Sequence, residues 1–325
     1  MNRETSLTAA IIQARPVCFD LARSVQKLED LLADASRRGA QVVTAGETFL
    51  PGYPAWLDLT KGAAYWDHPP VKDAFAELRA NSVVVAGPEV ERLSALCRDL
   101  GLVLVLGCHE RVESGPGNHT LYNTILTFTP EHGLANHHRK LVPTYTERLV
   151  WGPGDGKGLR AVSSACGRVG SLICWEHFMP LARHAMHESG EHVHIAVWPT
   201  AHEIHQTMSR SYALEGRCFV LAAGQIQTVE DIPPAMELAD DRAPGDLVLR
   251  GGSSVIGPDG SYVVEPVFDE ETIVVAELDL TQIDREAMTL DVTGHYHRPD
   301  VFRFEVCADR PGETRLMPGS DGGQD

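Results

Sequence analysis

The sequence predicts an α/β fold in which strands and helices alternate within a single domain. Three observations support this prediction. Short apolar runs typical of buried strands recur along the 325 residues, and segments with apolar residues at helical spacing lie between many of them. No polar linker divides the chain into halves. We therefore expect one domain over residues 1–304 and a flexible tail over residues 305–325.

In the first half of the chain, strands are expected at residues 9–14, 41–45, 102–108, 121–128 and 134–138. A helix is expected between Asp20, a residue type that caps helix N-termini, and Gly39, because apolar residues recur there at helical spacing (Leu21, Val25, Leu28, Leu31 and Leu32). Two further helices are expected, one after the aromatic start of segment 65–80 and one over 88–100.

In the second half, strands are expected at residues 169–173, 194–198, 219–223, 253–256, 261–265 and 272–279. Helices are expected from Pro180 to His187 and over about 206–217. The segment 228–246 is polar, acidic and contains proline, so we expect a surface loop there. Residues 291–304, rich in histidine and aromatic side chains, form a C-terminal extension.

The composition excludes several classes of function. The formal net charge is −17 and the pI is about 5.3, and a chain this acidic repels phosphate backbones. We therefore expect no nucleic-acid partner. No apolar run is long enough to cross a membrane, and the first residues do not resemble a secretory signal. Seven scattered cysteines without a CxxC pair indicate reduced thiols, so a cytoplasmic location is expected.

Three residues with complementary chemistry each follow a predicted strand: Glu47, Lys140 and Cys174. In open α/β sheets, ligands bind beyond the carboxyl ends of the strands, so these side chains are expected to meet there. Cys174 also lies between a strand and the helix from Pro180, a position near a helix N-terminus where a thiolate is favoured. A cysteine alone is more often a packing residue, and Glu47 alone has even odds of being a cap or a loop ion pair.

Together, the three residue types suit nucleophilic catalysis. A thiolate attacks an electrophilic carbon, a carboxylate accepts the thiol proton, and an ammonium stabilises the negative charge that forms. No histidine is required if burial raises the pKa of Glu47. Attack on a carbon–nitrogen bond fits this set best, because the carboxyl group can pass protons to departing ammonia.

Two long motifs carry a resemblance to a known family. Lys-Leu-Val-Pro-Thr-Tyr-Thr-Glu-Arg (140–148), followed by Trp-Gly-Pro-Gly-Asp-Gly (151–156), and Cys-Trp-Glu-His-Phe-Met-Pro-Leu (174–181) resemble the nitrilase, or carbon–nitrogen hydrolase, superfamily, and its true nitrilases in particular. The resemblance extends from about residue 8 to 304. It implies a Glu-Lys-Cys triad at Glu47, Lys140 and Cys174, with Glu147 as a second glutamate. It departs from many relatives at position 177, where they carry Asn.

The resemblance also implies a fold and an assembly. The family fold is a single-domain α-β-β-α sandwich that dimerises through its helices into four layers, and true nitrilases often extend into spirals. Residues 291–300 are similar to the C-terminal segment of these proteins, so about 285–304 are expected in oligomer contacts. We therefore expect a homodimer and a higher homo-oligomer.

The implied activity is hydrolysis of a small organic nitrile to the carboxylic acid and ammonia, through a thioimidate and a thioester on Cys174. If sulfur leaves before ammonia, the product is an amide. Lys140 and the backbone N–H of Trp175 are expected to stabilise the developing charge. Substrate contacts are expected from five residues, in part because aromatic side chains suit an apolar cleft: Tyr53, Thr144, Trp175, His177 and Trp198. No cofactor and no metal are expected. The sequence does not rank aliphatic, aromatic, arylacetonitrile or cyanide-type substrates.

Three alternatives remain open on the sequence alone. An amidase, a carbamoylase or a cyanide-type hydrolase would use the same triad. His-Glu-Ile-His (202–205) superficially resembles a zinc helix, but its spacing is one residue short and no third ligand is evident; the histidines at 184, 187, 192 and 194 are interpreted as a solvated face. A non-catalytic scaffold with this fold is disfavoured because all three catalytic residue types are present.

Overall fold

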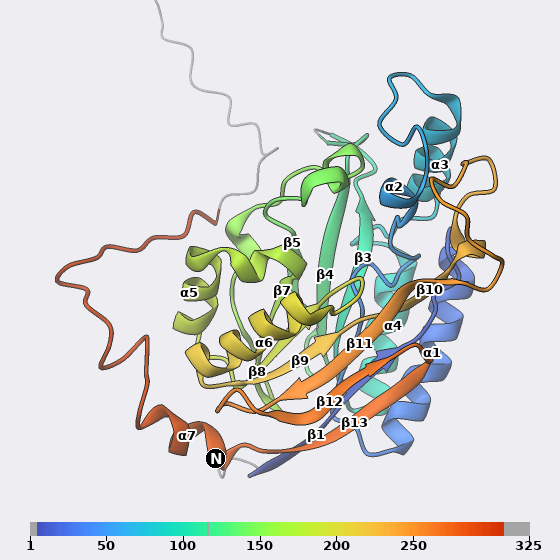
Figure 1. Ribbon diagram of the computed structural model, residues 1–325. Helices are drawn as coiled ribbons and strands as arrows, with labels where there is room; N and C mark the ends of the chain where they lie inside the picture. The colour runs from blue at the N-terminus through green and yellow to red at the C-terminus, as the bar shows by residue number, and fades with distance from the viewer. Residues whose placement is uncertain (1–4, 116, 309–325) are drawn as a thin grey trace, which may run out of the picture.

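The structure, a computed structural model, describes residues 5–115 and 117–308 (Figure 1). Two β-sheets pack face to face, and helices cover the outer face of each sheet. The predicted α-β-β-α sandwich is therefore confirmed. Among the described residues, no helix is both long and apolar enough to cross a membrane.

The six-stranded sheet has the order β13-β1-β2-β3-β4-β5. Strands β1, β2 and β3 are parallel, and the others pair antiparallel with their neighbours. The strands are β1 (Ser6–Gln13), β2 (Val42–Ala45), β3 (Val103–Arg111), β4 (Leu121–Thr129), β5 (Gly133–Arg139) and β13 (Thr272–Asp279).

The second sheet has the order β10-β11-β9-β8-β7-β6, with β12 beside β11. Its centre, β7, β8 and β9, is parallel. The strands are β6 (Val162–Ser164), β7 (Gly167–Ile173), β8 (Val193–Val197), β9 (Phe219–Ala223), β10 (Ile226–Thr228), β11 (Leu247–Ile256) and β12 (Tyr262–Phe268).

Helices α1 (Leu21–Arg37) and α4 (Pro88–Leu100) cover the first sheet, and α5 (Pro180–Glu188) and α6 (Glu203–Gly216) lie on the opposite side of the molecule (Figure 1). The remaining helices are α2 (Trp56–Leu59), α3 (Pro69–Ala80) and α7 (Thr281–Ala287). The described residues also form four short 3₁₀ helices: η1 (Tyr145–Leu149), η2 (Gly156–Gly158), η3 (Cys174–Phe178) and η4 (Val229–Asp231).

Alternation along β1 explains why two cores form. Leu7, Ala9 and Ile11 face the second sheet, whereas Ala10 and Ile12 face α1 and α4. Because successive side chains of a strand point to opposite faces, a strand that is apolar at nearly every position must be covered on both sides. The continuous apolar runs in the sequence thus require a sandwich with helices outside it.

Candidate active site

Glu47 lies in the loop that follows β2, between the two sheets, and is fully buried. Its backbone is held by the second sheet. The Glu47 N–H donates to the Trp198 carbonyl (3.2 Å), and Gln225 Nε2 donates to the Glu47 carbonyl (2.6 Å). Both partners follow strands of the second sheet, so packing of the two sheets fixes the position of this carboxylate.

Lys140 follows β5 and is buried between two carboxylates. Its Nζ donates to Glu47 Oε1 (2.8 Å) and to Glu147 Oε2 (2.7 Å). Its backbone carbonyl accepts from the Gly154 N–H (2.8 Å). A Cβ at Gly154 would lie 2.6 Å from this carbonyl oxygen and 2.2 Å from that of Arg139, so only glycine fits. The glycine-rich loop therefore positions the ammonium.

Glu147 belongs to η1 and is anchored from three directions. Besides Lys140, it accepts hydrogen bonds from the Thr144 backbone N–H (2.6 Å, at Oε2) and from the Tyr53 hydroxyl (2.9 Å, at Oε1). Hydrogen bonds to an ionised group are stronger than those between neutral groups, so this carboxylate is rigidly placed. Tyr53 in turn packs edge-on against Trp151, with ring centroids 5.9 Å apart.

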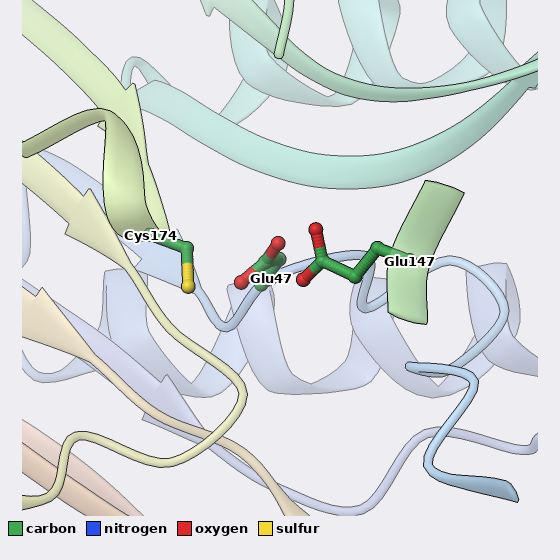
Figure 2. Close-up of side chains that lie close together, drawn as sticks. All are labelled: Glu47, Glu147 and Cys174. Atoms are coloured by element: carbon green, nitrogen blue, oxygen red, sulfur yellow. The ribbon is translucent and has the colours of Figure 1, made fainter. Parts of the chain in front are cut away.

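Cys174 is the first residue of η3, directly after β7. Its backbone is left-handed, with a φ of 52°, a conformation that costs a non-glycine residue about 1–3 kcal/mol. Its Sγ and one carboxylate oxygen each of Glu47 and Glu147 all lie within 4.8 Å of one another. Figure 2 shows the three side chains converging from separate segments of the chain.

The buried charges shift the ionisation of the site. Burial raises the pKa of Glu47 to about 7; Lys140 opposes this rise and Glu147 adds to it. Burial by itself would lower the pKa of Lys140, but the negative charges around it, of which Glu47 is the largest, raise that pKa above its usual value. The lysine therefore stays protonated, while Glu47 can exchange a proton near neutral pH.

The surroundings of Cys174 favour the protonated thiol. Burial, followed by the nearby charge of Glu47, raises its pKa well above the usual value. The helix N-terminus expected near this residue is that of a five-residue 3₁₀ helix, and α5 starts six residues later. The resting group is a thiol that requires a base. Glu47 Oε2 is buried beside it and accepts no hydrogen bond from a nitrogen or hydroxyl donor among the described residues.

Two residues that support the site were not identified from the sequence. Asn123 Nδ2, on β4, donates to Glu47 Oε1 (2.6 Å). Glu176 is buried and accepts from the backbone N–H groups of Ile173 and Leu141, at 2.7 Å each, which joins the segment before the cysteine to the segment after the lysine. An asparagine inside an apolar strand was the available signal for Asn123. The Leu141 contact of Glu176 has no local signature.

A cavity of about 370 Å³ opens onto Cys174 and Glu147. Three of the residues expected to contact substrate, Tyr53, Thr144 and Trp175, line it, together with residues for which no substrate contact was expected, among them Tyr145, His205 and Leu249. His177 and Trp198 are not among the lining residues. Both are fully buried and their rings pack on each other, 4.8 Å apart, so the structure does not support direct substrate contact for these two residues.

The expected solvated histidine face is also partly wrong. His187 and His194 are buried, because α5 and β8 turn them toward Glu191 and Tyr212 in the core rather than toward solvent. His184 remains partly exposed on α5.

Glu47, Glu147 and Cys174 are close enough to ligate a metal ion. However, the Lys140 ammonium already donates to both carboxylates and supplies a positive charge at this position. The donor set therefore fits a lysine-centred cluster better than a metal site. His202, the residue before α6, and His205, on α6, line the cavity with their rings 5.8 Å apart and do not belong to this cluster.

The fold and the site define the class of protein: a cysteine-dependent hydrolase built on an α-β-β-α sandwich. A family model described as Carbon-nitrogen hydrolase matches residues 8–286, and the chain belongs to that family. The resemblance inferred from the motifs is thereby confirmed.

Known relatives agree with this assignment. The chain is similar to an aliphatic nitrilase of Sinorhizobium fredii (strain HH103), with 41% identity over 307 residues, covering 93% of this chain and 96% of that protein. It is 36% identical over 306 residues to the bifunctional nitrilase/nitrile hydratase NIT4B of Nicotiana tabacum, covering 93% and 86% of the two chains. In fold it resembles a carbon-nitrogen hydrolase from Helicobacter pylori G27, with a TM-score of 0.69, 19% identity and coverage of 89% and 94%.

Proposed function

We propose that this enzyme is a nitrilase that hydrolyses a small organic nitrile to its carboxylic acid and ammonia, with Cys174 as nucleophile, Glu47 as general base and Lys140 as electrostatic stabiliser. The observation that carries this proposal is the buried cluster in which Lys140 Nζ donates to both Glu47 and Glu147 beside the thiol. The names of two relatives, an aliphatic nitrilase and a nitrilase/nitrile hydratase, support nitriles as the substrate class.

The first half of the reaction forms a thioimidate. Glu47 accepts the thiol proton, the sulfur adds to the nitrile carbon, and the proton passes to the nitrile nitrogen. A raised pKa makes Glu47 suited to both tasks, because a base that titrates near the working pH also returns its proton readily. Lys140 and the Trp175 backbone N–H stabilise the negative charge on nitrogen, and loss of one such donor typically costs about 10²–10³ in rate.

The second half releases the products. Water, deprotonated by Glu47, adds to the thioimidate carbon and gives a tetrahedral intermediate. Protonation of its nitrogen expels ammonia and leaves a thioester. A second water then adds, the carbon–sulfur bond breaks, and the acid departs as sulfur regains its proton. If the carbon–sulfur bond breaks first, the product is the amide, and the double name of the Nicotiana relative is a reason to measure both products.

Tyr53, Thr144 and Trp175 are the residues we assign to the substrate. Tyr53 and Thr144 also donate hydrogen bonds to Glu147, so the residues that line the cavity also position the second carboxylate. Trp175 is 42% exposed and packs on Phe178, and it gives the cavity an apolar side next to the thiol. The name of the Sinorhizobium relative makes aliphatic nitriles the first choice in a substrate panel.

The experiment that tests this function measures ammonia and acid release from aliphatic, aromatic and arylacetonitrile substrates and from the corresponding amides. Wild-type enzyme is expected to release acid and ammonia from at least one nitrile and much less from its amide, whereas Cys174→Ala releases none. Cys97→Ala, at a buried cysteine on the core-facing side of α4, serves as control and should retain turnover.

Ammonia from an amide but not from the nitrile would replace this proposal with an amidase. Loss of turnover with a chelator, combined with insensitivity to thiol alkylation, would replace it with a metal-dependent hydrolase.

We also propose that the enzyme works in a reducing compartment such as the cytoplasm and that it self-associates. All seven cysteines are free. Apolar side chains are exposed on the outer helices, including Leu181 on α5 and Ile204 and Leu214 on α6, and on the extension after α7, including Val301 and Phe302. Exposed apolar surface of this kind is typical of contacts between subunits.

A further inference from the structure

A chain of buried polar side chains begins at the carbonyl oxygen of Cys174 and leads away from the cavity. His177 Nδ1 lies 2.7 Å from that oxygen, and His177 Nε2 lies 2.9 Å from His194 Nε2. His194 Nδ1 forms a short hydrogen bond with Glu191 Oε2, and the Tyr212 hydroxyl donates to Glu191 Oε1 (2.5 Å). The four side chains come from η3, β8, the loop before β8, and α6, and all are buried.

The hydrogen-bond directions in this chain follow from the chemistry of its first member. A carbonyl oxygen can only accept, so the proton of His177 is on Nδ1. Burial and the neighbouring His194 lower the pKa of His177 well below its usual value, so its ring is neutral and Nε2 accepts. His194 Nε2 must therefore donate, and one proton must lie between His194 Nδ1 and Glu191. Each member thus orients the next.

The ring of His177 is also held by packing. It lies 4.8 Å from the Trp198 ring, and the ring of His194 stacks on Tyr212 at 3.8 Å. Packing alone does not require polar groups, since an apolar ring of similar size would fill the same space. Two buried imidazoles and a buried carboxyl group are costly unless fully hydrogen-bonded. Their arrangement leads to a single backbone atom beside the nucleophile.

That atom belongs to the peptide group that matters most for the proposed chemistry. The Cys174 carbonyl and the Trp175 N–H are parts of one planar trans peptide, so they point in opposite directions. Because the first N–H groups of a helix lack intrahelical partners, the Trp175 N–H at the start of η3 is available to a ligand. Cys174 itself has a left-handed φ of 52°, which is unfavourable for a non-glycine residue, so its surroundings must hold the backbone at this position.

We propose that His177, oriented by His194 and Glu191, is a positioning residue that prevents the Cys174–Trp175 peptide from turning over and so keeps the Trp175 N–H directed at the negative charge formed during attack. This inference rests on the proposed function, because it concerns the donor that stabilises the reacting nitrogen or oxygen. The hydrogen bond to the Cys174 carbonyl acts through the backbone, and His177 itself does not touch the substrate.

Two nearly isosteric substitutions distinguish the hydrogen bonds made by the two ring nitrogens of His177. In His177→Asn, the side-chain amide replaces the Nδ1 position and can still donate to the Cys174 carbonyl. In His177→Gln, the amide replaces the Nε2 position and keeps only the contact with His194. We expect kcat of the Asn variant to stay within about 10-fold of wild type and kcat of the Gln variant to fall about 100-fold, each with little change in KM.

A second measurement separates positioning from general loss of structure. Alkylation of Cys174 by iodoacetamide, followed by peptide mass spectrometry, displaces iodide and forms no oxyanion. The Gln variant should therefore alkylate at a rate close to wild type while its turnover is lost. Glu191→Gln, which retains a donor toward His194, should stay within a few-fold of wild type. His184→Asn is the control, a histidine on α5 whose ring packs against Phe304 and contacts no member of this chain, and should be unchanged.

The inference is overturned if His177→Gln turns over like wild type, if the Asn variant is no better than the Gln variant, or if alkylation and turnover fall together. Its failure is distinct from failure of the proposed function. Should the wild-type enzyme hydrolyse amides and not nitriles, the same comparison made on the amide still tests His177, because that reaction also passes through an oxyanion.

Discussion

Glu47, the proposed general base, owes its raised pKa to its surroundings. In water its carboxyl group would be ionised at neutral pH and would be a weak base, whereas burial between the sheets raises its pKa to about 7. Two donors on the same oxygen, Asn123 and Lys140, limit the rise. The value that results suits a group that must accept a proton and return it within each catalytic cycle.

The first residue-scale prediction concerns pH. Glu47 accepts the thiol proton only when it is ionised, so kcat/KM should decrease as the pH falls through about 7. Asn123→Leu removes a hydrogen bond that stabilises the charged form, which raises the pKa of Glu47 further. The acid limb of the pH–rate profile should therefore move to higher pH. The profile is measured with the best nitrile of the substrate panel.

Thr127→Val, a buried position on the same strand as Asn123, is the control and should leave the limb in place. A limb that stays unmoved in Asn123→Leu, or that moves to lower pH, would show that another group limits the rate.

Sequence reasoning identified the reactive groups but not the residues that tune them. Glu47, Lys140, Glu147 and Cys174 lie in recognisable motifs, and the structure places all four together. The contacts of Asn123, Glu176 and His194 depend instead on which strands become neighbours. His194 is the clearest example: its position in the sequence suggested solvent, and only the packing of β8 against α6 explains why it is buried.

At the scale of elements, the strongest patterns were predicted well. Helix α4 and strands β9 and β13 have the expected boundaries, and α1 begins after Asp20, whose carboxylate accepts from the Arg23 N–H at 2.9 Å. Elements without a long pattern were missed: β6, β10 and α7 have three, three and seven residues. Such short segments are stabilised by pairing and packing rather than by their own periodicity.

Segment 228–246 shows the same limit in a loop. Its composition predicted a surface loop, and most of it is one. However, Thr228 belongs to β10, and Ile232 and Met236 are buried in a small core around Trp56. Because the segment is polar on average, its composition gave no sign of the two apolar residues that anchor it to the core.

The element-scale prediction concerns the loop that positions Lys140. Gly154→Ala would place a Cβ 2.2 Å from the Arg139 carbonyl oxygen, so the backbone of the lysine must shift. We expect a loss of stability of about 1–3 kcal/mol, typical of overpacking. We also expect kcat to fall at least tenfold, because catalysis is sensitive to displacements of about 1 Å. Urea unfolding and steady-state kinetics measure the two effects.

Gly257→Ala is the matched control. Its Cβ would meet the side chain of Asp259 in a turn outside the site, and that side chain can move. Wild-type kinetics in the Gly154 variant would mean that the lysine is positioned by its carboxylate partners alone.

At the scale of the whole molecule, the segment after α7 differs from the rest of the chain. Over the described residues 288–308 it has no helix or strand and runs out from the two sheets (Figure 1). Its contacts with the body include the Phe304 ring against His184 on α5, while Tyr296, Val301 and Phe302 remain exposed. Exposed apolar side chains of this kind are suited to contact a second copy of the chain.

We therefore predict that truncation after residue 290 lowers the number of subunits in the assembly, calculated from the mass measured by light scattering after gel filtration. The sandwich itself should remain folded, with little change in far-UV circular dichroism. Arg298→Ala, which removes an exposed ion pair with Asp300 but no apolar surface, is the control and should leave the mass unchanged. An identical number of subunits before and after truncation would assign self-association to α5 and α6 alone.

The two sheets contribute different parts of the reaction centre. Glu47 and Lys140 follow strands of the six-stranded sheet, whereas Cys174 follows a strand of the seven-stranded sheet. Neither layer by itself holds both a nucleophile and its base. If the two sheets shift or separate, activity should be lost even when every strand remains paired within its sheet. Turnover therefore reports whether the two sheets are correctly packed against each other. Heat inactivation should begin when this tertiary packing is lost, even if the secondary structure remains.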